Sequence, residues 1–337
     1  MRRRQRPASS RRTGRSPPGN FWTPSMGACV ARCLVVGGNG FMGSYVVDEL
    51  VAAGHDVSVF DRFSTEVPSY GADGVRKFAG DFLNHADVRE AVAKQDYLFH
   101  FLSTTTPASA DNEPTLDLRT NVAASVDLFE LAVAAGVRKV YFASTGGAIY
   151  GEQDLSLISE RTLPEPVSPY AIGKQAIEGY LRYFAVRWGL ESTSFRISNP
   201  YGDRARVTRR QGVIPIFLHR IAAGQPIDVY GDGSAVRDYV YVRDVARMIV
   251  ATVDRPTQFP VYNVGSGTAT SLTELVELAR EVTGRSIEVR STVMPKTYVE
   301  RAVLDISRYV AEFGAPELTP LRDGLELTWR HILEQLT

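Results

Sequence analysis

Short apolar runs alternate with longer amphipathic stretches between residues 30 and 199. The runs are rich in β-branched and aromatic residues and cover Val30–Val36, Val57–Phe60, Phe99–Leu102, Val140–Ala143 and Thr193–Ile197. Between them, apolar residues recur at helical spacing over Gly40–Gly54, His85–Lys94, Leu116–Ala135 and Pro169–Trp188. Apolar strands that alternate with helices are typical of a parallel sheet covered on both faces. The pattern therefore predicts an α/β fold with a Rossmann-type doubly wound parallel sheet.

The rhythm changes after residue 199, where glycine-containing loops and shorter elements begin. The later elements are a short strand at Tyr239–Val242 and helices at Leu272–Thr283 and Leu321–Leu336. We expect a doubly wound domain over residues 26–199, to which helices from later segments return, and a smaller C-terminal α/β lobe over residues 200–337.

Residues 1–25 differ in composition from the rest of the chain. They contain seven arginines, no acidic residue and no apolar period, so we expect a disordered basic arm. The whole chain has 38 Lys and Arg against 38 Asp and Glu, which leaves residues 26–337 with a net charge of −7. Composition leaves several interpretations of the arm open: it has no role, translation begins at Met26, it is a targeting peptide, or it contacts anionic surfaces.

Composition also excludes several classes of protein. A neutral chain argues against a nucleic-acid partner, and no run of about 18 apolar residues exists that would span a membrane. Cys29 and Cys33 lie about 13 Å apart along one predicted strand and cannot bridge each other. The five histidines show no metal-ligand spacing. We therefore expect no metal and, since no secretory signal follows the arginines, a cytoplasmic location.

The first predicted strand ends in the run Gly37-Gly38-Asn39-Gly40-Phe41-Met42-Gly43, directly before a predicted helix. Glycines at three-residue spacing permit a tight turn and let backbone N–H groups approach a pyrophosphate at the positive end of the helix. We therefore predict a dinucleotide-binding site that contains Gly37, Gly40, Phe41, Met42 and Gly43.

Residues at the ends of the next two strands complete this predicted site. Asp61 ends the second strand, 18 positions beyond Gly43. A carboxylate there accepts hydrogen bonds from ribose hydroxyls and repels a 2′-phosphate, which favours NAD over NADP, although the neighbouring Arg62 acts in the opposite direction. Asp81 and Phe82 follow a further short strand that we expect directly before Gly80. Asp81 there either receives the adenine amino group or caps a turn.

Tyr170 and Lys174 form a Tyr-x-x-x-Lys pattern in a predicted helix. Residues four apart share a helix face, so the phenol and the ammonium group can point into one cleft. A tyrosine that acts as a base near neutral pH must lose about three pKa units, roughly 4 kcal/mol. A lysine about 5 Å away contributes about 3 kcal/mol at an effective dielectric constant near 20. We expect a catalytic pair; the alternative is a pair on an exposed helix surface.

Four further segments accompany the glycine run and the Tyr-Lys pair: Phe142–Gly151, Arg196–Gly202, Gly231–Val242 and Tyr262–Gly267. In order and spacing, the chain resembles the extended short-chain dehydrogenase/reductase family, and within it the UDP-glucose (UDP-galactose) 4-epimerase branch. The resemblance implies NAD in the first domain, a UDP-hexose in the C-terminal lobe, and 4-epimerisation through a 4-keto intermediate. It also implies a homodimer formed through the helices Leu116–Ala135 and Pro169–Trp188.

The resemblance implies roles for individual polar residues as well. Asn199 and Arg237 would hold the diphosphate of the nucleotide sugar, since Arg offers phosphate a planar fork of donors, and Tyr230 would line the uridine pocket. From the residues alone, the alternative interpretation is that Arg237 forms an ion pair with its neighbour Asp238 and that Tyr230 is a core residue. Asn121 corresponds to a family Asn near the active site.

The segment after the predicted strand Val140–Ala143 departs from the family pattern. Family 4,6-dehydratases carry an Asp-Glu pair where this chain has Gly146 and Gly147, which favours epimerisation over dehydration. Many epimerases carry a catalytic Ser at the position of Gly146. Thr145 or Ser144 would then supply the hydroxyl, and we choose Thr145 as a catalytic and substrate-contacting residue. The alternative is that both hydroxyls satisfy backbone groups.

Further departures concern the substrate. An Arg that family members often carry is Pro295 here, so Lys296 or Arg301 would contact the phosphate, and we choose Arg301. Ala302 lies near the position that limits sugar size, and a small residue there would admit an N-acetyl group. UDP-glucuronate 4-epimerases typically carry Thr at the position of Asn199, which disfavours that activity. It stays an alternative, as does a net sugar-nucleotide oxidoreductase.

Overall fold

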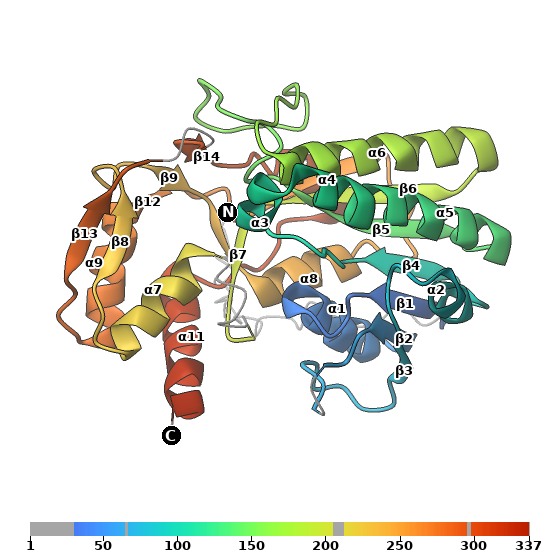
Figure 1. The fold of residues 1–337 in the computed structure, drawn as a ribbon, viewed down its shortest axis with the longest axis horizontal. Coiled ribbons are helices and arrows are strands. Elements are labelled where there is room, and N and C mark those ends of the chain that lie inside the picture. Colours follow the sequence, from blue (N-terminus) through green and yellow to red (C-terminus); the bar gives the residue numbers. More distant parts are fainter. Residues whose placement is uncertain (1–29, 65–66, 205–211, 295–297, 337) are drawn as a thin grey trace, which may run out of the picture.

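The computed structural model describes residues 30–64, 67–204, 212–294 and 298–336. The predicted arm over residues 1–25, together with Cys29 and Lys296, lies outside the described residues. Figure 1 shows a large sheet covered by helices and, to its left, a smaller lobe of short strands and helices. In the described part of the chain, no helix has the length and apolarity needed to cross a membrane.

Seven parallel strands form the large sheet, in the order β11-β6-β5-β4-β1-β2-β3. The strands are β1 (Arg32–Val36), β2 (Asp56–Asp61), β3 (Arg76–Ala79), β4 (Tyr97–His100), β5 (Lys139–Thr145), β6 (Glu191–Ile197) and β11 (Val261–Val264). The predicted doubly wound sheet is therefore confirmed, and the strand order reverses between β1 and β4. Since β11 comes from the segment after residue 199, a strand as well as helices returns to the sheet.

Helices cover both faces of the sheet. One layer contains α2 (His85–Val92), α5 (Ala124–Ala135) and α6 (Pro169–Trp188), and the other contains α1 (Phe41–Ala52), α8 (Val242–Val250) and α10 (Ser307–Phe313). Successive side chains of a strand point to opposite faces, so Cys33 and Val35 of β1 pack with α1 while Leu34 and Val36 pack with α5 and α6. Complete burial of all four explains why β1 is apolar after the exposed Arg32.

The long helix predicted over Leu116–Ala135 is interrupted. The segment contains the end of α4 (Pro114–Asp117), a π-helical turn η1 (Leu118–Ala123) and α5, and a short helix α3 (Pro107–Asn112) precedes it. Asn121 in this turn accepts a hydrogen bond from the N–H of Thr104 at 2.9 Å and donates to Asp117 at 2.8 Å. Side-chain contacts with the loop after β4 therefore accompany the wider turn, and such turns are frequent at functional sites.

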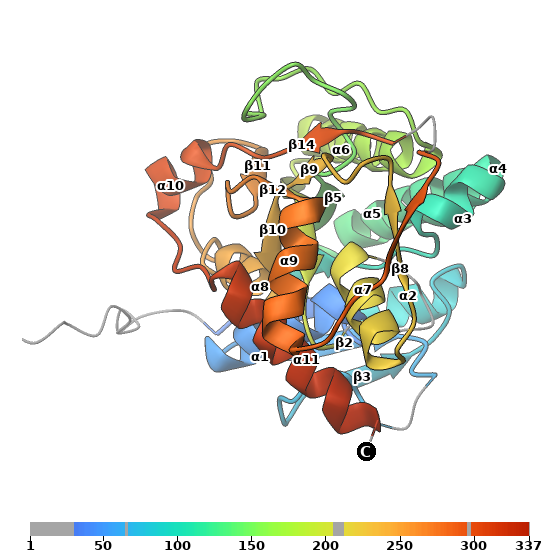
Figure 2. The ribbon, with the colours of Figure 1, turned by 90° about the vertical axis from the view of Figure 1, so that its left-hand side faces the viewer.

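The C-terminal lobe has its own hydrophobic core, and Figure 2 places its helices in front of the sheet. Its strand pairs are β7 (Asn199–Tyr201) with β10 (Tyr239–Tyr241), and β8 (Ile227–Tyr230) with β13 (Val289–Thr292). A three-stranded sheet contains β12 (Thr270–Ser271), β9 (Val236–Arg237) and β14 (Arg301–Ala302). The helices are α7 (Val213–Ala222), α9 (Leu272–Thr283) and α11 (Leu321–Leu336), the last two with the predicted bounds.

The aromatic side chains that pack beneath α6 should contribute to the free energy of unfolding. Phe184 is 1% exposed, and its ring centroid lies 5.7 Å from that of Phe129 and 5.0 Å from that of Trp188. Phe184→Ala should lower the free energy of unfolding by about 3–5 kcal/mol, measured by urea denaturation, because it leaves a cavity. Glu90→Ala, on the exposed face of α2, is the control and should change it by less than about 0.5 kcal/mol. Equal losses in both variants would contradict this packing.

Candidate functional site

A cavity of about 860 Å³ lies between the sheet and the C-terminal lobe. It opens at the carboxyl ends of the strands, beside the switch point between β1 and β4, where doubly wound sheets bind their ligands. Most of the predicted site residues line it: Gly40, Phe41, Met42, Gly43, Asp61, Thr145, Tyr170, Lys174, Asn199, Tyr230 and Arg237. The structure thus brings residues from both lobes to one space.

The glycine turn packs backbone against backbone. Gly37 has a φ of +84°, and a Cβ there would lie 2.7 Å from the backbone nitrogen of Leu102. A Cβ on Gly43 would lie 2.2 Å from the carbonyl oxygen of Gly37. The first turn of α1 has neither an acidic side chain nor a side-chain cap, so its N–H groups are available to an anion. These residues fit the pyrophosphate of a dinucleotide.

Asp61 lines the cavity beside this turn and accepts hydrogen bonds from the N–H groups of Asn39 at 3.1 Å and Arg62 at 2.8 Å. Its place at the end of β2 is that of a carboxylate that binds the adenosine ribose. The Arg62 side chain turns instead to Asp81, 3.1 Å away, and neither of these two lines the cavity. Phe82 is buried in the layer under α2.

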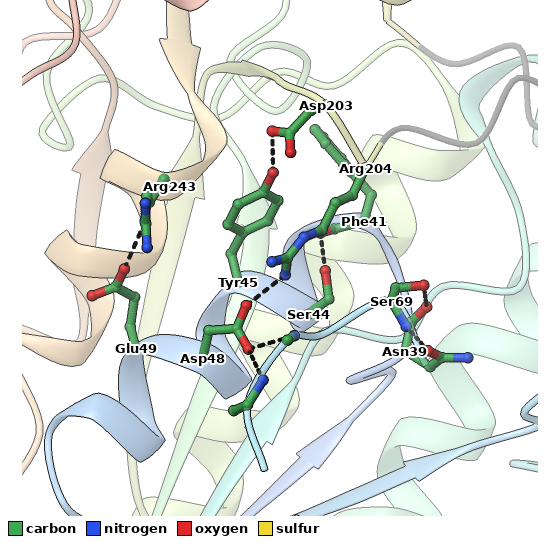
Figure 3. Close-up of polar contacts among 12 residues, drawn as sticks. Asn39, Phe41, Ser44, Tyr45, Asp48, Glu49, Ser69, Asp203, Arg204 and Arg243 are labelled. Carbon is green, nitrogen blue, oxygen red and sulfur yellow. Dashed lines mark hydrogen bonds and ion pairs between the residues drawn. The ribbon is translucent and has the colours of Figure 1, made fainter. Parts of the chain in front are cut away.

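Polar contacts join α1 to the loop after β2 and to the segment after β7 (Figure 3). Asp48 accepts hydrogen bonds from the N–H groups of Gly71 at 2.9 Å and Ala72 at 2.8 Å. Arg204 pairs with Asp48 at 2.7 Å, and its guanidinium lies 4.1 Å from the ring centroid of Tyr45. The helix that presents the glycine turn is thereby held to both segments.

Tyr170 and Lys174 lie at the start of α6, and both line the cavity. The Nζ atom of Lys174 donates to the carbonyl of Ala143 at 2.8 Å and lies 5.8 Å from the ring centroid of Tyr170. Burial lowers the pKa of Lys174 to about 8. Burial also raises the pKa of Tyr170 to about 12, and the Asp117 carboxylate adds to the increase. Burial and the Asp117 charge both disfavour the phenolate, so the lowered tyrosine pKa that the base needs stays a prediction for the cleft with NAD bound.

The two hydroxyls at the end of β5 differ in their surroundings. The Oγ of Ser144 donates to Glu178 at 2.5 Å, and Glu178 pairs with Arg196 at 2.8 Å in a largely buried ion pair. Ser144 and Thr145 both line the cavity, and they differ in that the Ser144 hydroxyl is bound to this ion pair. A Cβ on Gly146 would lie 2.9 Å from the carbonyl oxygen of Arg196, so a serine does not fit at that position. The geometry therefore favours Thr145 over Ser144 as the hydroxyl that faces a ligand.

Arg237, Tyr230 and Asn199 face the cavity from the other side. The guanidinium of Arg237 lies 4.6 Å from the ring centroid of Tyr298, whose centroid is 5.2 Å from that of Tyr230. Asp238 is fully buried and accepts hydrogen bonds from backbone N–H groups, and the described residues form no ion pair between it and Arg237. A half-exposed Tyr230 is likewise no core residue. A cation beside aromatic rings suits a nucleoside diphosphate.

Two residues predicted to contact or admit the sugar lie elsewhere. Arg301 donates to the carbonyl of Ser156 at 3.2 Å and does not line the cavity. Ala302 is buried in β14, opposite Arg237 in the neighbouring strand, and is also absent from the lining. Several lining residues escaped prediction: Phe101, Ser103, Thr105, Phe217 and Tyr298. The first three follow β4, so the switch-point rule could have indicated them, whereas no sequence signal indicates the last two.

Fold and cavity together define a dinucleotide-dependent enzyme of the Rossmann class with a Tyr-Lys pair. Within the described residues, no cluster of His, Cys, Asp and Glu could hold a metal ion. The chain belongs to the NAD dependent epimerase/dehydratase family, which matches residues 33–265. It is 36% identical to the UDP-glucose 4-epimerase of Mycolicibacterium smegmatis over 304 residues, which cover 88% of this chain and 97% of the relative.

Solved structures of the same family are similar over nearly the whole chain. The UDP-glucose 4-epimerase of Thermotoga maritima with UDP-glucose has a TM-score of 0.85 and 34% identity, over 91% of this chain and 100% of that one. The UDP-glucose 4-epimerase of Thermus thermophilus in complex with NAD has a TM-score of 0.83 and 33% identity, over 90% and 99%.

Because the backbones of Gly37 and Gly43 lie so close together, we expect one added methyl group to weaken the binding of NAD. Gly43→Ala places a Cβ against the Gly37 carbonyl, and such overpacking costs about 1–3 kcal/mol. The affinity for NAD, measured by calorimetry, should therefore fall by about 5- to 150-fold. In the control Gly71→Ala, the new Cβ has no neighbour within 3.9 Å, and the affinity should stay unchanged. Normal NAD affinity in Gly43→Ala would refute the assignment of this turn.

Proposed function

We propose that the protein is an NAD-dependent 4-epimerase of UDP-hexoses, UDP-glucose and UDP-galactose or their N-acetyl forms. One observation carries the proposal: a single cavity contains the glycine turn, the pair Tyr170 and Lys174, and the guanidinium of Arg237. A dinucleotide and a sugar diphosphate can therefore meet at the pair. Membership of the family, and similarity to UDP-glucose 4-epimerases solved with UDP-glucose or with NAD, support the same conclusion.

Each residue of the pair has its own role in the proposed reaction. Tyr170 takes the proton from the sugar 4-hydroxyl and returns it once the 4-keto sugar has turned over in the pocket. Lys174 places a positive charge beside the phenol and binds the nicotinamide ribose, while Thr145 shares the proton path. Arg237 and Asn199 anchor the diphosphate during the turn. The chemistry that bound NAD would supply is the uptake of hydride from C4 of the sugar and the return of that hydride to the opposite face.

The residues after β5 support epimerisation over dehydration. Elimination of water from the sugar needs an acid and a base beside it, and Gly146 and Gly147 provide neither. Other conversions of nucleotide sugars on this scaffold, UDP-glucuronate 4-epimerisation or net oxidation, are the alternative. Incubation with a panel of UDP- and dTDP-sugars, with products identified by NMR, separates them. Stoichiometric NADH release would favour the oxidoreductase.

Loss of one hydroxyl should remove the activity. Tyr170→Phe deletes the proposed base, so kcat with UDP-glucose should fall by about 100- to 10,000-fold. The matched control is Tyr180→Phe, which removes an exposed hydroxyl from the same helix and should leave kcat unchanged. A Tyr170→Phe enzyme that epimerises at the wild-type rate would end the proposal.

We also propose a homodimer formed through α5 and α6. Four large apolar residues of α6 are exposed on one side of the helix, next to the exposed Arg182 and Arg187: Ile172, Tyr180, Tyr183 and Val186. Val186 is 85% exposed. An apolar stripe of this kind is typical of a surface that packs against another helix.

A charge in this stripe should separate the subunits. Val186→Glu would bury an unpaired carboxylate at a cost of at least about 3 kcal/mol, which weakens dimerisation by about 100-fold. Light scattering should then report a monomer at concentrations where the wild type is a dimer. Val293→Glu, at a 92% exposed position of the C-terminal lobe, is the control and should remain dimeric. A dimeric Val186→Glu protein would place the interface elsewhere.

A further inference from the structure

A buried carboxylate lies against the helix turn that carries the Tyr-Lys pair. Asp117, at the end of α4, is 3% exposed. Its Oδ1 accepts a hydrogen bond from the Nδ2 of Asn121 at 2.8 Å and another from the hydroxyl of Thr105, which lines the cavity. Its Oδ2 faces α6, because a Cβ on Gly173 would lie 2.3 Å from it. Gly173 stands between Tyr170 and Lys174 in the sequence of α6.

The hydrogen-bond partners of Asp117 are neutral, and among the described residues it forms no ion pair. Its negative charge therefore acts on the groups around it. Burial has the largest effect on the pKa values of the pair, and Asp117 has the second largest. Asp117 raises the pKa of Tyr170 further and opposes the lowering of the pKa of Lys174.

The other titratable groups that face the pair are compensated or neutral. Glu178 of α6 also acts on Lys174, but it pairs with Arg196 of β6 at 2.8 Å. His100 of β4 is fully buried, and burial followed by the charge of Lys174 lowers its pKa to about 3, so that it is neutral near pH 7. Among the described residues, Asp117 is thus a carboxylate beside the pair that forms no ion pair with an arginine.

We propose that Asp117 is a positioning residue for the catalytic pair, and that its carboxylate is the counter-charge of the buried Lys174 and is held against α6 at Gly173. The proposal rests on the proposed function, in which Tyr170 acts as the base. Asp117 itself touches no substrate. It keeps the buried lysine charged and makes the phenolate form only where additional positive charge is present.

The sign of the effect follows from the charge. Without the carboxylate, the ammonium form of Lys174 is less stable, so its pKa falls. The phenolate form of Tyr170 is less disfavoured, so its pKa falls too. A reaction that needs phenolate and ammonium together has an acid and an alkaline limb in its pH profile, and the pKa values of both groups set their positions. Both limbs of the pH profile of kcat should therefore move toward acid.

The test uses the full-length enzyme with bound NAD and UDP-glucose. Asp117→Asn keeps the shape and the acceptor oxygen but removes the charge, and both limbs should move by about 1–2 pH units. Asp127→Asn is the matched control, because Asp127 on α5 is half-exposed, does not line the cavity and pairs with His85 at 3.0 Å. Its limbs should coincide with those of the wild type. Unmoved limbs in Asp117→Asn, or limbs that move in opposite directions, would overturn the proposal, whatever happens to kcat.

A second variant guards against a folding defect in the first. Gly173→Ala adds a methyl group that displaces the Asp117 carboxylate from α6 without removing it, and alanine favours a helix. The limbs should move in the same direction by a smaller amount, and a profile identical to that of the wild type would contradict the proposal.

Tyrosinate absorbance separates this proposal from the proposed function. The titration of Tyr170, obtained as the difference between each protein and its Tyr170→Phe counterpart, needs no turnover. Asp117→Asn should lower the titration midpoint even if none of the UDP-sugars is a substrate. An unchanged midpoint refutes the role of Asp117 alone, whereas an inactive enzyme with a shifted midpoint refutes the epimerase alone.

Discussion

The close approach of two glycine backbones is the constraint on which the site depends. The carbonyl oxygen of Gly37 occupies the space that a side chain at Gly43 would need, since a Cβ on Gly43 would lie only 2.2 Å from this oxygen. Because of this approach α1 begins directly beyond β1 and presents its free N–H groups at the edge of the sheet. The neighbouring strands end along the same edge, and Asp48 and Arg204 hold the helix to the segments on either side of it (Figure 3).

Burial decides the electrostatics at the opposite wall of this cavity. Lys174 is buried and Tyr170 is partly buried, so the phenol resists ionisation and the ammonium loses protons more readily than in solution. A lysine charge by itself therefore does not prepare the base. The balance depends on Asp117 beneath the pair and on the positive charge that a bound nicotinamide brings to the cleft. A π-helical turn keeps Asn121 in contact with Asp117.

Elements that depend on local signals could be predicted well. The helix Pro169–Trp188 has the predicted bounds, because Ser168 caps its first turn and Gly189, with a φ of +70°, ends it. The five strands of the sheet that were predicted with bounds lie within two residues of their predicted ends, whereas β11 was not predicted. The predicted helix over Leu116–Ala135 forms, but its π-helical turn was not predicted, because the turn accompanies hydrogen bonds to the loop after β4 that helical periodicity does not reveal.

The sequence by itself determined the doubly wound fold, the dinucleotide turn and the Tyr-Lys pair, since each depends on residues close together along the chain. Only the tertiary structure decided which neighbouring side chains face the cavity. It engaged Ser144 with Glu178, turned Arg301 toward Ser156 and set Tyr298 beside Arg237. These outcomes depend on partners that are distant in sequence and on the loss of water around them. Residue spacing records neither of these.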